Sequence, residues 1–437
     1  MQTTKNPFRT APGDVHEKLG KYMLADGFSL VFDYEKSQGV NIHDSRTGET
    51  YLDLFSFFAS QPLGFNHPKM TDPAFVEKLA MIALVKPTNS DVYTQAMADF
   101  VETFAEVTIP ASHRNHLFFV EGGGLAVENA MKAAFDWKYR KNVAKGGTDT
   151  EDLQILHFEN AFHGRTGYTL TVTNTNDPRK YQYFPKFDWP RAPTPTCVGD
   201  VAGIEASEKV SLEAIRTAIA ERPDKIAGIL IETIQGEGGD NHFRAEFLRE
   251  LRDICDREDI LLIFDEVQCG MGLTGTWWAF EQLGVEPDIF CFGKKAQVCG
   301  IAANKRLDEV ESVFQVSSRI NSTWGGNLVD MVRSEQCIRI IKEDNLLDNV
   351  NKVGAIFQAG LEKIASETAK IKNVRGRGVM LAFDFDNEKD RDAFSARLYE
   401  RKVLMLTSGN LSMRTRPVLD MDQAAVERAL AEISASL

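Results

Sequence analysis

The chain lacks the features that mark membrane, secreted or nucleic-acid-binding proteins. None of its 437 residues belongs to an apolar run long enough to span a bilayer. Acidic residues outnumber basic ones by 63 to 50, and the net charge of -13 argues against a nucleic acid or an anionic membrane as partner. Met1–Thr10 has no apolar core of a secretory signal, so we expect a cytoplasmic protein.

Patterns of cysteine and histidine that would hold disulfides or metals are also missing. The six cysteines are scattered without a CxxC pair, which indicates buried, reduced thiols. The eight histidines form no ligand cluster. His113 and His116 are three residues apart, but that spacing alone is a poor ligand signal, and we expect no metal.

Two short apolar runs that end in charge organise the sequence. Leu261–Phe264 leads to Asp265, and Phe290–Phe292 leads through a glycine to Lys294. A strand buried on both faces reads as a continuous apolar run, and open α/β sheets bind ligands at the carboxyl ends of their strands. We therefore expect an acid and an amine at one rim of a sheet.

An acid and an amine in this arrangement predict pyridoxal phosphate as cofactor. The carboxylate of Asp265 can keep a pyridine nitrogen protonated, and desolvation can lower the pKa of Lys294 until its amine bonds to an aldehyde. Lys295 is the competing lysine, since a lysine beside an apolar run is often only a gatekeeper. Asp265 could also simply begin a solvated loop.

Other strand ends could supply the rest of the site. Gly122-Gly-Gly124 lies between an expected strand and a helix and could cradle a phosphate, although it is neither a P-loop nor GxGxxG and a tight turn is the simpler interpretation. Phe162 could stack on a cofactor ring or belong to the core. Arg165 and Arg416 could clamp carboxylates, but either alone is more often a surface residue. The aromatic segment Phe55–Pro68 fits a buried loop and a pocket wall equally well.

The alternation of strands and helices predicts an α/β fold. Residues 71–325 should form a large cofactor-binding domain with a mostly parallel sheet. Residues 1–70 read as an arm and a short antiparallel meander, and 326–437 as long helices flanking strands. We expect these two segments to form a smaller α+β domain together. The expected strands of the large domain are His116–Val120, Leu153–Phe158, Ile226–Ile231, Leu261–Phe264 and Phe290–Phe292.

The strand-end motifs resemble the signature of class-III (omega) aminotransferases. Phe264-Asp-Glu-Val-Gln268 and Phe292-Gly-Lys294 carry the resemblance, and Gly122–Ala134 and Phe162–Arg165 match the family in order and spacing. The resemblance covers essentially the whole chain.

Some positions depart from the general class. Lys295-Ala-Gln-Val-Cys-Gly300 stands where a glycine-rich turn is usual, and Leu328–Arg333 replaces the usual proline and alanines. These departures, with Gly236–Arg244 and Asn321–Gly326, resemble the lysine 6-aminotransferase subgroup.

The resemblance implies a fold-type I pyridoxal-phosphate enzyme that is an obligate homodimer with active sites at the interface. It makes Lys294 the Schiff-base lysine and proton carrier, Asp265 the partner of the pyridine nitrogen, and Phe162 the residue that stacks on the ring. The remaining cofactor contacts implied are Gln268 near the phenolic oxygen, Gly123 and Gly124 at the phosphate, and Thr323 at the phosphate of the neighbouring subunit.

The resemblance also implies a substrate site. Arg165 should hold the α-carboxylate, Asn321 should contribute to substrate binding, and Glu237 and Arg416 should form a switchable ion pair. The implied reaction moves the side-chain amine of L-lysine to 2-oxoglutarate, giving 2-aminoadipate 6-semialdehyde and L-glutamate. Ornithine, 4-aminobutyrate and diaminobutyrate remain alternative donors, because pocket length cannot be read from sequence. A catalytically silent binding protein on the same fold is a further alternative, against which Lys294, Asp265 and Arg165 argue.

Overall fold

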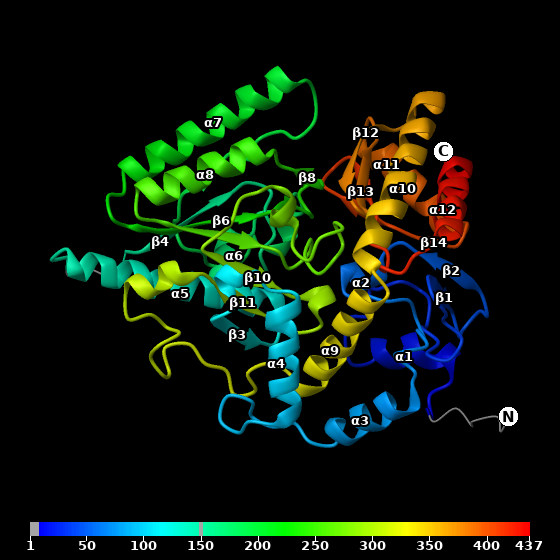
Figure 1. Ribbon diagram of the computed structural model, residues 1–437. Helices are drawn as coiled ribbons and strands as arrows, with labels where there is room; N and C mark the ends of the chain where they lie inside the picture. Colours follow the sequence, from blue (N-terminus) through cyan, green and yellow to red (C-terminus); the bar gives the residue numbers. More distant parts are fainter. Residues whose placement is uncertain (1–7, 148–151) are drawn as a thin grey trace.

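A seven-stranded sheet forms the centre of the larger part of the molecule (Figure 1). The computed structural model describes residues 8–147 and 152–437, so the first seven residues of the expected arm, and most of the segment inspected for a secretory signal, lie outside it. The strand order is β3-β11-β10-β9-β6-β4-β5. Neighbours are parallel, except that β11 runs antiparallel to both β3 and β10. The predicted mostly parallel α/β sheet is confirmed.

The strands lie close to the positions expected from the apolar runs. Their bounds are β3 (His116–Val120), β4 (Gln154–Phe158), β5 (Arg191–Ala192), β6 (Ile226–Glu232), β9 (Leu261–Asp265), β10 (Ile289–Phe292) and β11 (Cys299–Ala303). Two of them were not expected. β5 is a two-residue edge strand inside a proline-rich loop, and β11 is built largely from small residues. At Gly300 a Cβ would lie 2.1 Å from the Phe118 carbonyl oxygen, so glycine allows the close approach of β11 to β3.

Helices cover both faces of this sheet (Figure 1). Helix α5 (Gly123–Ala144) packs on one face, and α7 (Val201–Ala220) and α8 (Ala245–Arg257) cover the other. In β9, Ile263 belongs to the core under α5, whereas Phe264 belongs to the core under α8. Burial on both faces explains why this strand reads as an unbroken apolar run.

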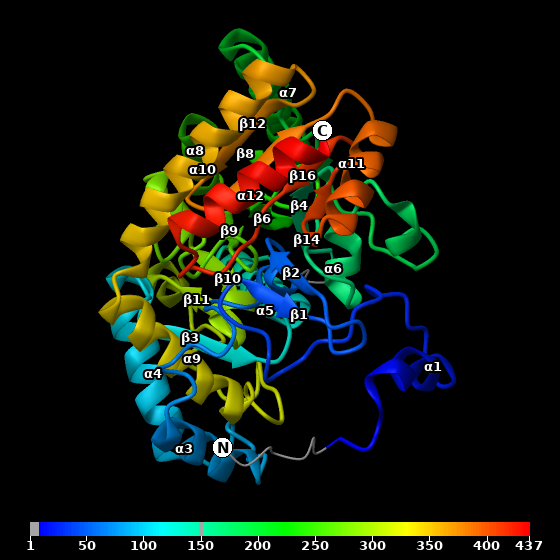
Figure 2. The ribbon, with the colours of Figure 1, turned by 90° about the vertical axis from the view of Figure 1, so that its right-hand side faces the viewer.

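Strands from the N-terminal and C-terminal parts of the chain lie side by side in the smaller part of the molecule (Figure 2). The strand β14 pairs in parallel with β2 of the N-terminal hairpin, and a second, four-stranded sheet lies beside long helices. A smaller α+β unit formed from both termini is therefore confirmed, while the boundaries near residues 70 and 325 stay predictions. The meander expected within residues 1–70 is smaller than predicted, because its first part, residues 29–35, contributes only an isolated bridge between Phe32 and Asp44.

The remaining elements complete the smaller part and the connections. The strands are β1 (Asn41–His43), β2 (Thr50–Asp53), β7 (Ile234–Gln235), β8 (Asn241–His242), β12 (Lys372–Arg377), β13 (Met380–Asp384), β14 (Val403–Leu404), β15 (Leu406–Ser408) and β16 (Ser412–Arg414). The helices are α1 (Val15–Gly20), α2 (Ser56–Ala59), α3 (Pro73–Ala83), α4 (Gln95–Val107), α6 (Gly167–Val172), α9 (Leu328–Glu343), α10 (Leu346–Thr368), α11 (Glu388–Glu400) and α12 (Gln423–Ser436). Within the described ranges, no helix combines the length and apolarity needed to cross a bilayer. The side chains described there also form no metal-ligating cluster of three or more His, Cys, Asp or Glu.

Candidate active site

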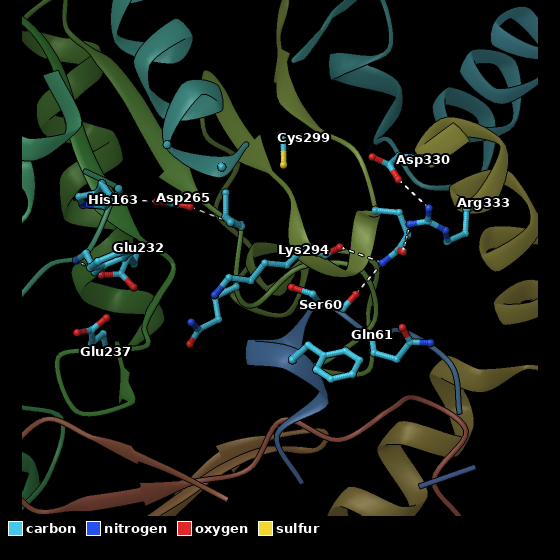
Figure 3. Close-up of a pocket in the computed structure, with 18 residues that line it drawn as sticks. Ser60, Gln61, His163, Glu232, Glu237, Asp265, Lys294, Cys299, Asp330 and Arg333 are labelled. Carbon is cyan, nitrogen blue, oxygen red and sulfur yellow. Dashed lines mark hydrogen bonds and ion pairs between the residues drawn. The ribbon is translucent and has the colours of Figure 1, made fainter. Parts of the chain in front are cut away.

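A cavity of about 550 Å³ opens where β9 and β10 end (Figure 3). Asp265 is the last residue of β9 and lies opposite Cys291 of β10, two residues before the turn that carries Lys294. Parallel neighbours therefore deliver the acid and the amine to one rim, as the sequence predicts. The predicted site residues that line the cavity are Gly123, Gly124, Phe162, Glu237, Asp265, Gln268 and Lys294.

Asp265 is a buried carboxylate with two fixed contacts. Its Oδ2 lies 2.8 Å from Nδ1 of His163, and its Oδ1 accepts a hydrogen bond of 3.0 Å from the Val267 amide. The side chain is 6% exposed, so a solvated loop start is excluded. His163 was not assigned a role from the sequence, although it directly follows Phe162. Its Nε2 is buried and has no hydrogen-bond partner among the described residues.

The two neighbouring lysines point in different directions. Lys294 lines the cavity on a left-handed backbone with a φ of 50°. Burial, reinforced by the charges of Arg414 and Arg416, lowers the pKa of Lys294 to about 8. Lys295 is 2% exposed and its Nζ donates instead to the carbonyl oxygen of Gln61, at 2.7 Å. The structure therefore brings Lys294, and not Lys295, to the cavity.

We expect the Lys294 amine of the cofactor-free protein to titrate near pH 8 rather than near its ordinary value of 10.5. The neutral, nucleophilic amine should therefore become the major form as the pH rises through about 8. Carbon-13 dimethylation of lysines, followed by NMR across a pH series, measures this directly. The resonance missing from Lys294→Ala should have the lowered midpoint, and a midpoint above 10 for that resonance would contradict the expectation.

The start of α5 has the geometry of an anion site. Gly122 has a φ of 103°, and no described side chain caps the helix, so backbone N–H groups of its first turn face the cavity rim. A Cβ on Gly123 would lie 2.9 Å from Cγ1 of Val267. Glycine is therefore needed here for packing as well as for access to the backbone.

Glu232 is a cavity residue that the sequence analysis did not single out. It ends β6 directly opposite Asp265 in the sheet register. Its carboxylate accepts hydrogen bonds from the amides of Phe162 and Gly236, each at 2.9 Å. Burial, with a contribution from the charge of Asp265, raises the pKa of Glu232 to about 7. The signal was present, because Glu232 ends an apolar run just as Asp265 does.

Glu237 and Arg416 have other partners in this conformation, so the switchable ion pair between them stays a prediction. Among the described contacts, Oε1 of Glu237 accepts from the Nζ of Lys180. Arg416 is 1% exposed and forms two hydrogen bonds with the carboxylate of Asp240, at 2.9 and 2.5 Å. Asp240 prevails because it is fully buried beside the guanidinium, whereas Glu237 lies at the cavity edge (Figure 3).

A second arginine accompanies Arg416 behind the cavity wall. The Oε1 atom of Gln268 accepts hydrogen bonds from Arg414 and from Arg416, both at 3.0 Å. Burial, reinforced by the charge of Arg416, lowers the pKa of Arg414 to about 10. The Nε atom of Arg414 is buried without a partner among the described groups. Gln268, which lines the cavity, thus separates two arginines from it.

Four predicted residues lie outside the cavity lining of this single chain, namely the buried Arg416 and three exposed residues. Arg165 is exposed, and its guanidinium carbon lies 5.9 Å from the ring centroid of Phe162. Asn321 and Thr323 are exposed on the segment that precedes α9. Their contributions to substrate and phosphate binding stay predictions.

The aromatic segment forms a wall of the cavity in an unusual conformation. Ser56, Phe57, Phe58 and Ala59 have φ values of 40°, 52°, 58° and 69°, so α2 is a left-handed turn. This conformation costs about 1–2 kcal/mol per residue outside glycine. Phe57 lines the cavity. The segment thus lines the cavity at Phe57, while its other residues Phe55, Leu63 and Phe65 are buried, so both interpretations hold for part of it.

Comparison with known proteins places the whole chain within one family of sequences. The model described as "Aminotransferase class-III" matches residues 23–437. The L-lysine-epsilon aminotransferase of Amycolatopsis lactamdurans is 49% identical over 100% of this chain and 98% of the relative. The protein of that name from Mycobacterium tuberculosis is 48% identical over 98% of this chain and 96% of its own. The solved structure of lysine aminotransferase from M. tuberculosis matches with a TM-score of 0.96, covering 98% of this chain and 99% of that chain.

Proposed function

Because the chain belongs to the class-III aminotransferase family, we propose that it transfers the ε-amino group of L-lysine to 2-oxoglutarate. The products are 2-aminoadipate 6-semialdehyde and L-glutamate. The observation that carries the reaction type is the acid–amine pair, Asp265 and Lys294, on the rim of one cavity. The similarity of the full chain to relatives named as L-lysine-epsilon aminotransferases supports lysine as the donor.

The enzyme depends on pyridoxal phosphate, and the residues of the cavity fit that cofactor. The uncapped start of α5 at Gly123 suits the phosphate, and the buried carboxylate of Asp265 suits a protonated ring nitrogen. Phe162 offers a ring face, and Lys294 has an amine with a lowered pKa. When bound, the cofactor supplies an electron-poor ring that accepts the electron pair left on the substrate carbon.

The protein's own groups bind the substrate and move protons. Nζ of Lys294 takes the proton from the carbon that bears the amino group of the donor, and that carbon ends as the aldehyde carbon of the product. In the second half-reaction Nζ of Lys294 delivers a proton to the keto carbon of 2-oxoglutarate, which becomes the amino-bearing carbon of glutamate. Asp265 keeps its charge in place through the Val267 amide and His163. Phe57 gives one side of the cavity an apolar surface.

One cavity must accept two differently charged substrates. Lysine enters as a chain with two ammonium groups and one carboxylate, whereas glutamate carries two carboxylates. We propose that Glu237 and its partner Lys180 adjust the charge at the cavity edge, while Arg414 and Arg416 supply positive potential from behind Gln268. Arg165 and Asn321 are proposed to complete the substrate site.

We further propose a cytoplasmic homodimer with shared active sites. Thr323 is exposed and lies outside its own cavity, which suits a contact with the phosphate bound by a neighbouring subunit. Arg165 and Asn321 are also exposed, and a second subunit could enclose them.

A panel of amino donors tests the proposed substrate. With 2-oxoglutarate as acceptor, we expect glutamate formation to be fastest with L-lysine, and kcat/KM to be lower for ornithine, 4-aminobutyrate and 2,4-diaminobutyrate. Blocking the ε-amine in Nε-acetyllysine should prevent the reaction, whereas blocking the α-amine should not. Faster turnover of another donor would overturn the choice of lysine, and no turnover of any donor would favour a silent binding protein.

The same panel run on Glu237→Ala tests the charge argument. Loss of this carboxylate leaves Lys180, Arg414 and Arg416 with less compensation, so the cavity becomes more positive. The lysine half-reaction should therefore slow by about tenfold more than the glutamate half-reaction. Glu367→Ala, at an exposed position of α10, is the matched control. Equal losses in both half-reactions would contradict a role for Glu237 in choosing between substrates.

A further inference from the structure

The turn after β10 carries two side chains that hydrogen-bond to the wall of the cavity; Gln297 also lines the cavity, whereas Lys295 does not. Lys295 donates from Nζ to the carbonyl oxygens of Gln61 and Pro417, at 2.7 and 3.0 Å, and to Oγ of Ser56 at 3.3 Å. Gln297 donates from Nε2 to the carbonyl oxygen of Ser60 at 2.6 Å. Both residues belong to the stretch where a glycine-rich turn was expected.

The contacts of Lys295 require its protonated form. The hydroxyl of Ser56 donates its own hydrogen to the carbonyl oxygen of Arg416, so Ser56 can only accept from Lys295. Gln61 and Pro417 offer carbonyl oxygens, which also only accept. Three acceptors call for three N–H donors, which an ammonium has and a neutral amine lacks. Lys295 is thus a buried cation whose three N–H groups all donate hydrogen bonds, and it is not available as a second nucleophile.

The wall segment at residues 56–59 needs stabilising contacts from other parts of the chain. Residues 56–59 have four consecutive positive φ values, a conformation that L-residues do not keep without support. Asp53 fixes the start of the segment, because its Oδ1 accepts from the amides of Phe55 and Ser56 at 2.9 and 2.8 Å. Lys295 and Gln297 fix its end at Gln61 and Ser60.

A third departure from the family pattern joins the same network. Arg333 of α9 donates from Nη1 to Oε1 of Gln297, at 3.3 Å, and pairs with Asp330 at 2.9 Å (Figure 3). The amide of Gln297 is thereby oriented, with its oxygen toward Arg333 and its nitrogen toward the wall. In the sequence, Lys295, Gln297 and Arg333 stood out only as departures from the family pattern. In the structure their side chains form one polar network, which we call the brace.

We propose that Lys295 and Gln297 are positioning residues that hold the left-handed turn Ser56–Ala59 and thereby set the shape of the substrate pocket at Phe57. The brace connects the catalytic turn at Lys294 to that wall, so the wall and the amine move together. The consequence is a fixed position for Phe57 in the cavity lining, which favours binding of the amino donor. This part rests on the proposed function, whereas the mechanical role of the brace does not.

Hydrogen–deuterium exchange of the holoenzyme without substrate tests the mechanical role. Lys295→Met should speed exchange of the peptide covering residues 54–61 by about tenfold, because buried acceptors lose their donors. The measurement is made at pH 6.5, below the pKa of about 7 to which burial lowers Lys295. Lys363→Met, at an exposed position of α10, is the control and should leave this peptide unchanged.

Steady-state kinetics of the same variants test the effect on the pocket. The KM for lysine should rise by about tenfold in Lys295→Met, with a smaller fall in kcat. Gln297→Met should shift exchange and KM in the same direction by less, and it decides the matter if Lys295→Met does not fold. Unchanged exchange of residues 54–61 would overturn the brace. Faster exchange with an unchanged KM would overturn the role of the brace in the pocket. If the enzyme prefers a donor other than lysine, the KM is measured for that donor instead, and the exchange result keeps its meaning.

Discussion

Lys294→Ala should lose turnover almost completely while the protein remains folded. In the proposed mechanism this residue supplies both the amine that anchors the cofactor and the base that moves the substrate proton. Loss of a positioned general base alone typically costs 10²–10⁴-fold, so we expect kcat to fall by about 10⁴-fold or more. Lysine half-reactions followed through the cofactor's absorbance, at a cofactor concentration that saturates the variant, measure this.

The neighbouring lysine provides the control for this result. Borohydride reduction of the wild-type enzyme followed by peptide mapping should place the cofactor mass on Lys294. Lys295→Ala should keep that attachment and retain measurable turnover, because Lys295 faces the wall segment and not the cavity. Attachment to Lys295, or rapid turnover by Lys294→Ala, would show that the choice between the two neighbours is wrong.

The sheet and its ligand edge could be predicted because burial on both faces leaves a strong pattern. The expected strand Leu261–Phe264 agrees with β9 to within one residue, since every position of β9 is buried. Strand β11 was missed because glycine and alanine lend it little apolar character. Gly300 allows β11 to approach the backbone of β3 closely, and no local sequence pattern predicts such a contact.

The contacts among charged side chains were harder to predict. The sequence offered Glu237 for Arg416, but the carboxylate that reaches this arginine is Asp240, three residues later in the same glycine-rich stretch. Lys180, the partner of Glu237, lies 57 residues away in a loop without periodicity. Pairing of this kind depends on how loops turn and on how deeply each carboxylate is buried, and neither is encoded in spacing.

The brace at Lys295 differs from these ion pairs, because the residues that depart from the family pattern have a physical explanation in the structure. A buried lysine, a glutamine and an arginine replaced small residues at separated positions, and all three contribute to one hydrogen-bonded network. A left-handed turn of four residues without glycine could not be foreseen, because its stability comes from these distant donors and not from local preference.

Asp265→Asn should lower kcat by about 10²–10³-fold, the second largest effect that we expect. Asparagine keeps the size of the side chain and an acceptor for the Val267 amide, but it removes the charge that we propose holds a proton on the cofactor's ring nitrogen. Asp265→Ala should lose at least as much activity. It should also lose stability, since His163 and the Val267 amide would each lose a buried partner, at about 1–3 kcal/mol for each group.

A variant of the adjacent residue Glu266 is the control for Asp265→Asn. It separates the effect of losing charge at the cofactor ring from the effect of losing any buried carboxylate. Glu266 is 1% exposed, lies away from the cavity lining, and accepts hydrogen bonds from the amides of Ala279 and Phe280, at 2.9 and 3.0 Å. Glu266→Gln should therefore alter the thermal midpoint of the protein more than its kcat. Rate constants of the half-reaction and melting curves of both variants decide the matter. An Asp265→Asn enzyme within tenfold of wild type, or an equal loss of kcat in Glu266→Gln, would remove Asp265 from its proposed place beside the ring nitrogen.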